Sequence, residues 1–179
     1  VVVDDGSTDD STHVYGESAR ELARRGLELR YLPLRHRGKG SAVRHGVFAA
    51  VGDPIVFLDA DLPIPVEIIA DFLRAIDAGA DIAIASRYVP RSLVDRPWWR
   101  VLMGLVFRMF VRALVPTGVN DTQCGGKAYT AEAAKDLFSR QRLDGFAFDA
   151  EVLFLARRAR LRVVEIPFVL RRHHGSSID

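Results

Sequence analysis

Val56-Phe57-Leu58-Asp59-Ala60-Asp61 is the most informative stretch of the chain. Its apolar run is typical of a buried strand in a parallel sheet, and it ends abruptly in two carboxylates. Side chains two residues apart on an extended chain share a face, so Asp59 and Asp61 are predicted to point the same way. Ligands of open α/β sheets bind beyond the carboxyl ends of the strands, where hard oxygen donors suit Mg²⁺ or Mn²⁺ shared with a phosphate. The stretch therefore predicts a metal-dependent enzyme that acts on a nucleotide or a phosphate.

Strands and helices alternate around this stretch, which predicts an α/β domain with a doubly wound, mostly parallel sheet. Gly26 and Gly79 end helices, and Pro65 begins one. The length of 179 residues predicts one domain over 1–179. The expected strands cover residues 1–3, 27–32, 55–58, 81–85, 162–166 and 168–170, and the expected helices cover 11–25, 41–51 and 65–78, with another that begins at 148.

Composition narrows the class of protein. Hydrophobic residues make up 49% of the chain, enough for a core, and the net charge of +2 predicts no nucleic-acid partner. Cys124 is the single cysteine, which excludes an internal disulfide and a cysteine-rich metal site. A lone cysteine suits a reducing compartment.

Polar side chains follow other predicted strands. Asp4-Asp5 come directly after Val1-Val2-Val3 and could accept hydrogen bonds from a nucleobase or ribose; a plain helix cap is the alternative. Arg87 follows the strand at 81–85, on the same rim as the aspartates, where a guanidinium could bind a phosphate bidentately. A surface ion pair is the alternative for Arg87.

The basic stretch Arg37-Gly38-Lys39-Gly40-Ser41 is similar to a P-loop but departs from its pattern. Pro33 stands at the first glycine position, and Gly40 replaces the hydroxyl residue, so an ATPase or GTPase is excluded. Lys39 remains a candidate point charge for a phosphate, with a solvated basic turn as the alternative.

Residues 98–115 are apolar except for a stripe at steps of four. The run is short for a membrane span, and each arginine at mid-membrane costs about 2.5–3.5 kcal/mol on insertion scales. The pattern favours an amphipathic helix at a membrane surface, with a core helix or a subunit contact as the alternative. The stripe consists of Arg100, Gly104, Arg108 and Arg112.

Taken together, the chain resembles family 2 glycosyltransferases with the GT-A fold. It is most similar to dolichyl-phosphate mannose synthases and to dolichyl- or polyprenyl-phosphate glucosyltransferases, with DTQCG-x-K closer to the glucosyltransferase branch. The motifs occur in family order over nearly the whole chain: VVVDDGSTDDS, RGKGSAVRHG, FLDADLPIPVE, ASRY, DTQCGGKAY, FDAEVLFLARR and RRHHGSS.

The resemblance implies roles for ten residues and a metal, Mg²⁺ or Mn²⁺. Asp59 and Asp61 would hold the metal against the diphosphate of a nucleotide-sugar donor, and Asp4, Asp5 and Lys39 would bind the nucleotide. Arg87, Arg100 and Arg172 would lie near the phosphates of the donor and of a polyprenyl or dolichyl phosphate acceptor. Asp121 and Gln123 would line the sugar or acceptor side.

The chain also departs from the family. The family's first strand and its Pro-x-Tyr-Asn-Glu-like motif are absent, which predicts an amino-terminal truncation, unpaired strand edges, a cavity and low stability. Pro63 stands where some relatives have a glutamine metal ligand, and Ile178 where many have lysine.

The expected reaction is inverting, metal-dependent transfer of a hexose, with UDP-glucose favoured over GDP-mannose as donor. The expected location is the cytoplasm, with peripheral attachment to the cytoplasmic face of a membrane. Two alternatives stay open: a phosphatase of the haloacid dehalogenase type, which also places Asp-x-Asp after a strand, and a non-catalytic membrane-binding module.

Overall fold

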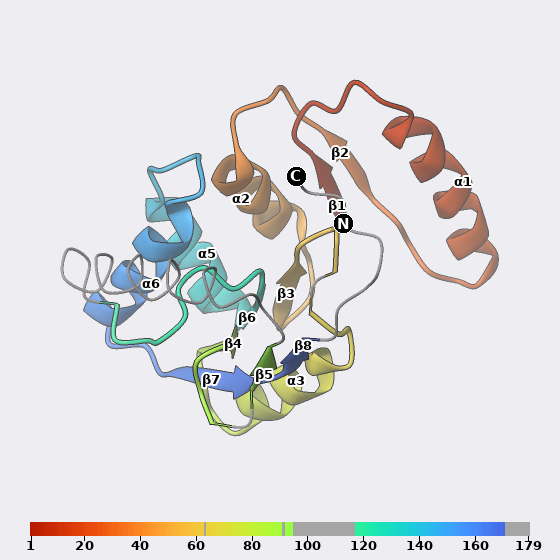
Figure 1. The fold of residues 1–179 in the computed structure, drawn as a ribbon. Coiled ribbons are helices and arrows are strands. Elements are labelled where there is room, and N and C mark those ends of the chain that lie inside the picture. Colours follow the sequence, from red (N-terminus) through yellow and green to blue (C-terminus); the bar gives the residue numbers. More distant parts are fainter. Residues whose placement is uncertain (63, 91, 95–116, 171–179) are drawn as a thin grey trace.

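The computed structural model describes residues 1–62, 64–90, 92–94 and 117–170, and these form an α/β fold (Figure 1). A four-stranded sheet has the order β3–β6–β4–β7. β4 (Ile82–Ser86) pairs parallel with β7 (Val163–Pro167), whereas β6 (Gly126–Tyr129) runs antiparallel between β4 and β3 (Ile55–Leu58). The α/β class is confirmed, and the insertion of β6 between β3 and β4 is a feature that the alternation of strands and helices does not reveal.

Helices cover both faces of this sheet (Figure 1). α2 (Lys39–Ala49), α5 (Ala131–Arg140) and α6 (Phe148–Arg158) contact one another on one side. α3 (Ile68–Asp77) packs on the other side against β4, β6 and β7. The sheet is therefore buried on both faces, as its apolar strands require.

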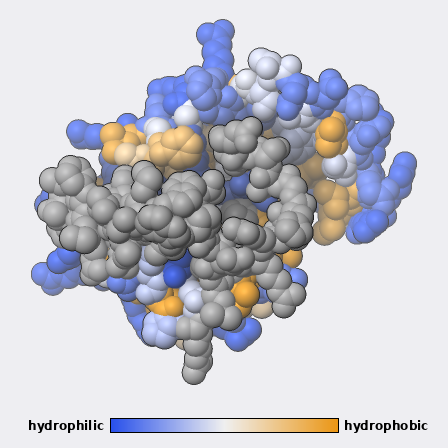
Figure 2. Space-filling view, in the orientation of Figure 1, coloured by the Kyte–Doolittle hydropathy of each residue, from blue (hydrophilic) through white to orange (hydrophobic). Residues whose placement is uncertain are grey.

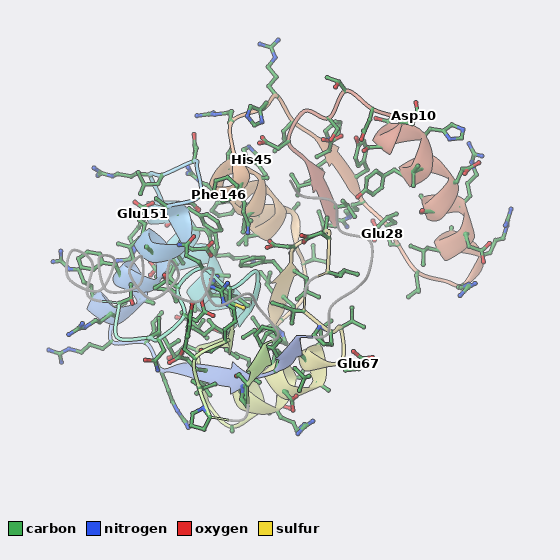
Figure 3. All side chains as sticks on the ribbon, in the orientation of Figure 1. Asp10, Glu28, His45, Glu67, Phe146 and Glu151 are labelled. Carbon is green, nitrogen blue, oxygen red and sulfur yellow. The ribbon has the colours of Figure 1, made fainter. Side chains whose placement is uncertain are left out.

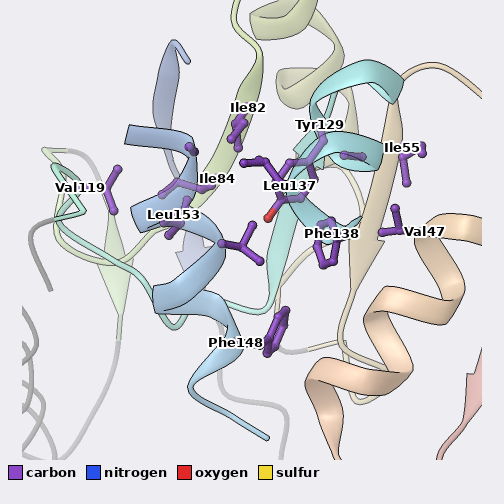
Figure 4. Close-up of a cluster of buried hydrophobic side chains, with 13 residues drawn as sticks. Val47, Ile55, Ile82, Ile84, Val119, Tyr129, Leu137, Phe138, Phe148 and Leu153 are labelled. Atoms are coloured by element: carbon purple, nitrogen blue, oxygen red, sulfur yellow. The ribbon is translucent and has the colours of Figure 1, made fainter. Parts of the chain in front are cut away.

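β4 explains how one strand serves two cores. All five of its residues are buried, and alternate side chains enter opposite faces of the sheet. Ile82 and Ile84 join the larger hydrophobic cluster between the sheet and α2, α5 and α6, where Phe138 and Phe148 also pack (Figure 4). The alanines of β4 face the smaller cluster beneath α3, whose members include Ala83, Ala85, Cys124 and Phe72.

A separate parallel pair, β1 (Val2–Asp4) and β2 (Tyr31–Pro33), carries α1 (Ser11–Arg24). Among the described residues it shares no strand pairing with the four-stranded sheet. A pocket of about 560 Å³ lies between β1, α2 and β3, lined mainly by apolar side chains such as Val2, Val43 and Val56. The amino-terminal truncation and the low stability expected from it stay predictions.

Most element boundaries fall within two residues of those expected, with two exceptions. α3 begins at Ile68 and not at Pro65, after a turn at 66–67. β2 is the other exception. The strand was expected over 27–32 but spans Tyr31–Pro33, because β1 offers partners only for these three residues. Pro33 is tolerated there since an edge strand does not need every N–H. The strand expected over 168–170 is β8 (Val169–Leu170), whereas α5, β5 (Leu93–Val94) and the parallel pairing of β5 with β8 were not anticipated.

Several expectations concern residues outside the described ones. These are the amphipathic helix at 98–115, Arg100 within it, Pro63, Arg172 and Ile178. In the part of the chain that the structure describes, no helix is long and apolar enough to cross a membrane. Exposed hydrophobic side chains there are scattered among hydrophilic ones on the visible face (Figure 2).

Candidate active site

Asp59 lies directly beyond the end of β3 and forms an ion pair with Lys39, the first residue of α2. The ammonium Nζ is 2.7 Å from Oδ1 and 3.0 Å from Oδ2 of the carboxylate. The side chains of Lys39 and Asp59 are 23% and 28% exposed, respectively. The pair is thus accessible enough for either partner to exchange its contact for a ligand.

Asp61 is placed by a turn, which corrects the extended geometry expected for this stretch. The amide of Leu62 donates to the carbonyl of Asp59 at 3.0 Å, and Leu62 has a positive φ of 44°. The chain therefore reverses immediately after Asp59, because a two-residue step along a turn does not repeat a side-chain direction as a strand does. Asp61 is exposed at the tip of this turn.

Gly125 packs directly against Asp59. Its carbonyl accepts a 3.0 Å hydrogen bond from the Asp59 amide, and a Cβ at position 125 would overlap the Asp59 carboxylate. Gly125 is the last residue of the loop that precedes β6. The absence of a side chain at Gly125 is thus what lets the carboxylate occupy its place.

Arg87 and Asp121 form a bidentate ion pair at the neighbouring strand end. Nε of Arg87 lies 2.6 Å from Oδ2 of Asp121, and Nη2 lies 2.7 Å from Oδ1. Burial alone would lower the pKa of the Arg87 guanidinium, but the hydrogen bonds and charge of Asp121 outweigh it and raise the pKa. The Arg87 side chain is 19% exposed and that of Asp121 is 1% exposed. The Asp121 carboxylate is therefore buried and contacts Arg87 from the protein interior.

Glu165 on β7 holds the start of the loop that runs from Asn120 to β6. Its carboxylate accepts hydrogen bonds from the backbone amides of Asn120 and Asp121 at 3.0 and 3.1 Å. Gln123, two residues on, is half-buried. Sequence reasoning missed Glu165, since a glutamate in a strand pattern carries no signal for a contact 44 residues away.

Asp4 and Asp5, at the end of β1, both turn toward the protein. The Asp4 carboxylate accepts from the amide of Ser7 at 2.7 Å and from the hydroxyl of Tyr31, and these hydrogen bonds lower the pKa of Asp4 to about 2, the one from Tyr31 most. Asp5 accepts from the backbone amides of Arg37 and Gly38 at 2.9 and 2.8 Å. Asp5 thereby holds the basic loop that leads to Lys39, and its nucleotide contact stays a prediction.

The other side of the basic loop is held by the segment before α6. The Ser41 amide donates to the carbonyl of Asp144 at 3.1 Å, and a Cβ at Gly40 would lie 2.6 Å from the carbonyl oxygen of Leu143. Glu151 on α6 in turn accepts from the amides at 142 and 143. Figure 3 shows Glu151 and Phe146 on the side of the molecule where α2 carries His45.

The chemistry of these donors suits a metal that is shared with a substrate. Asp59 and Asp61 are the acidic groups at the tip of β3, and no cluster of three or more histidine, cysteine or acidic side chains occurs among the described residues. Mg²⁺ is usually held by one or two carboxylates with waters and substrate phosphates rather than by a closed protein cage. The two aspartates fit such a metal, with Asp59 exchanging its contact with Lys39.

Comparison with known proteins assigns the chain to a family. Residues 1–138 match the family described as Glycosyl transferase family 2. The chain belongs to this family. Membership removes the haloacid dehalogenase alternative and confirms the resemblance seen in the ordered motifs.

Similar curated proteins include two dolichyl-phosphate beta-glucosyltransferases. The one from Dictyostelium discoideum is 30% identical over 100% of this chain, and the one from Homo sapiens is 32% identical over 99% of it. The chain spans only 57% of the length of each of these relatives.

Similar solved structures include glucosyl-3-phosphoglycerate synthase from Mycobacterium tuberculosis in complex with Mn²⁺ and UDP-glucose. It is 22% identical, with a TM-score of 0.63 over 99% of this chain and 61% of that one. The same enzyme with Mg²⁺ and UDP gives a TM-score of 0.62 at 21% identity. At this level of identity the likeness establishes the fold.

Proposed function

We propose that the protein transfers a hexose from a nucleotide-diphosphate sugar to a polyprenyl or dolichyl phosphate, with inversion at the anomeric carbon. UDP-glucose is the favoured donor and GDP-mannose the next. The observation that carries the proposal is the accessible Lys39–Asp59 pair at the end of β3, in a chain whose curated relatives are named dolichyl-phosphate beta-glucosyltransferases.

Asp59 and Asp61 would hold Mg²⁺ or Mn²⁺ against the donor diphosphate. When bound, the metal would neutralise charge that develops on the leaving nucleotide diphosphate. Lys39 would then be released from Asp59 and could contact a phosphate oxygen as a point charge. Because Asp5 fixes the backbone just before Lys39, the ammonium would stay at this rim when its partner changes.

Arg87 would orient the second anion. Its bidentate pairing with Asp121 uses the Nε and Nη2 atoms, and a guanidinium has five N–H donors in all. The remaining donors could contact a phosphate while Asp121 keeps the plane of the guanidinium fixed. Asp121 would thus orient Arg87, and Gln123 would contact the sugar or acceptor. Arg100 and Arg172, outside the described residues, are proposed to bind phosphates as well.

The acceptor needs little activation. A phosphate monoester has a second pKa of about 6, so it is largely ionised at pH 7 and already nucleophilic. A strong general base is therefore not required, and the protein would act mainly by positioning two anions and by stabilising charge.

The proposal also includes attachment to the cytoplasmic face of a membrane, where a polyprenyl phosphate resides. It rests on the sequence of residues 98–115, whose apolar surface and arginine stripe suit the lipid boundary. Liposome binding without nucleotide binding would instead favour the non-catalytic membrane module.

A donor panel tests the reaction. The purified protein is incubated with polyprenyl phosphate, Mg²⁺ or Mn²⁺, and UDP-glucose, GDP-mannose or UDP-GlcNAc in turn. We expect glucose transfer that stops on chelation and resumes when the metal is restored. Phosphate release without a glycosylated lipid, or transfer that persists in the chelator, would contradict the proposal.

A further inference from the structure

Lys127 and Asp149 form an ion pair sealed inside the protein beneath the candidate active site. Nζ of Lys127 lies 2.6 Å from Oδ1 of Asp149, and the two side chains are 0% and 2% exposed. Taking both charges out of water is costly, and replacing such a pair by apolar residues of similar volume is often neutral or stabilising. Stability alone is thus a weak reason for this pair to exist.

Lys127 lies between the two strands that carry the candidate catalytic groups. On β6 it stands opposite Phe57 of β3, and also opposite Ile84 of β4. Asp59 follows Phe57 by two residues, and Arg87 follows Ile84 by three. Lys127 therefore lies in the sheet two to three residues before the positions of Asp59 and Arg87 on the neighbouring strands.

From this position Lys127 holds the loop that joins the two groups. Its Nζ donates a 2.6 Å hydrogen bond to the carbonyl of Cys124. Before Cys124 in the chain, the Asp121 carboxylate accepts a hydrogen bond from Arg87. After Cys124, the Gly125 carbonyl accepts a hydrogen bond from the Asp59 amide. A single buried donor thus anchors the centre of a loop whose ends contact Asp59 and Arg87.

Asp149 fixes the ammonium from the opposite side. It is the second residue of α6, where the N-terminal dipole of the helix stabilises a carboxylate. Burial raises the pKa of Asp149, while the Lys127 ammonium opposes the rise and the charges of Lys39 and Asp59 also act on it.

We propose that Lys127 and Asp149 are positioning residues, which place the loop at 121–126 and through it the Asp59 carboxylate and the Arg87 guanidinium. The proposal rests on the proposed function, because it assigns the pair to the donor-binding geometry of that site. Neither residue touches a reacting atom.

The test compares stability with donor binding in K127M/D149L, which replaces the pair by apolar side chains. Thermal unfolding reports the fold, calorimetry reports the affinity for UDP with Mn²⁺, and a thiol reagent reports the exposure of Cys124. Cys124 suits this purpose as the single cysteine, since it is 3% exposed and burial raises the pKa of its thiol to about 11.

We expect the double variant to keep a wild-type unfolding midpoint and to lose UDP affinity about 10- to 100-fold, the usual effect of removing groups that orient a metal ligand. The Cys124 thiol should become reactive. The matched control is R140M/D136L, which removes an exposed pair on α5 and should leave all three readouts unchanged.

A second variant, K127Q/D149N, keeps polar groups at both positions and should retain more UDP affinity than the apolar pair. Wild-type affinity in a folded K127M/D149L protein overturns the inference, whatever the thiol does. If neither double variant folds, the pair is required for folding and the positioning role is rejected. Wild-type protein that does not bind UDP with Mn²⁺ would reject the proposed function, and the inference with it.

Discussion

Two lysine–aspartate pairs of nearly equal length have opposite environments in this fold. The Lys39–Asp59 pair is 2.7 Å long with side chains 23% and 28% exposed, whereas the Lys127–Asp149 pair is 2.6 Å long with side chains 0% and 2% exposed. Water screens the first pair and offers each charge an alternative partner. The second pair has no such alternative, since either charge left alone would be buried and uncompensated.

The comparison shows how burial assigns roles to the same two residue types. The accessible pair is suited to exchange, and under the proposed function its carboxylate would bind a metal and its ammonium a phosphate. The sealed pair is suited to hold the backbone in one place. A contact that exchanges partners keeps its geometry only if the backbone around it is held in place. The loop at 121–126 connects the buried Lys127–Asp149 pair to the accessible Lys39–Asp59 pair.

The largest effect is expected from Asp59→Asn, which removes the exchangeable carboxylate. Metal stabilisation of a leaving phosphate is worth several kcal/mol, so we expect transfer to fall by about 10³-fold or more. Initial rates with UDP-glucose and polyprenyl phosphate check this, and Asp61→Asn should behave similarly. Asp71→Asn, at an exposed carboxylate on α3, is the control. Retained turnover in the Asp59 variant would remove the metal assignment.

The next effect separates the two pairs by stability. Asp149→Asn leaves the Lys127 ammonium buried without its partner, and we expect a loss of about 3–5 kcal/mol in the free energy of unfolding. Lys39→Met breaks the accessible pair and should change that free energy by about 1 kcal/mol or less. Urea denaturation of both variants measures the difference, and equal losses would show that the two pairs are not energetically distinct.

A smaller change, Gly125→Ala, tests the contact that links the loop to Asp59. The added Cβ would overlap the Asp59 carboxylate, and overpacking of this kind costs about 1–3 kcal/mol. We expect weaker Mn²⁺-dependent binding of UDP, measured by calorimetry. Gly16→Ala on α1, where a Cβ meets nothing within 4 Å, should leave binding unchanged and stabilise the helix slightly. Unaltered UDP affinity in the Gly125 variant would show that Asp59 relocates freely.

The smallest effect concerns Asp4, an aspartate held by neutral hydrogen bonds instead of a lysine. Its folded-state pKa of about 2 lies below the ordinary value of 3.8, so its contribution to stability is present above pH 3.8 and is lost as the pH falls through 2. Tyr31→Phe removes the largest cause, and we expect the pKa of Asp4 to rise toward 3.8. A carboxyl NMR titration measures it, with Glu28 as an internal control, since Arg30 lowers the pKa of Glu28 and neither Asp4 nor Tyr31 acts on it.

The sequence was informative where a pattern is local. The strand at 55–58, the helix that begins at 148 and the aspartates at the ends of β1 and β3 all follow from short runs of apolar residues with their stops. β2 was misplaced because its start depends on the length of β1, a partner more than 25 residues away in the chain. The geometry expected for Asp61 failed because the strand rule was extended past the end of the strand into a turn.

Contacts between distant residues could not be read from the chain. Glu165 meets the amide of Asp121 44 residues away, and Lys127 meets Asp149 22 residues away. The residues around Lys127 and Asp149 in the sequence do not predict that these two side chains pair. Charged residues of these kinds are usually exposed, so the sequence alone favours a surface position for both.

The family resemblance, the α/β class and the candidate carboxylates could all be predicted from the sequence, because ordered motifs, periodicity and strand ends are properties of neighbouring residues. Three features became visible only in the folded chain: Asp5 holds the loop before Lys39, Asp121 pairs with Arg87, and one lysine–aspartate pair is accessible while the other is buried. They could not be predicted because exposure and pairing depend on which segments become neighbours in the fold. The insertion of β6 between β3 and β4, which no short stretch of sequence specifies, places Lys127 between the strands that lead to Asp59 and Arg87.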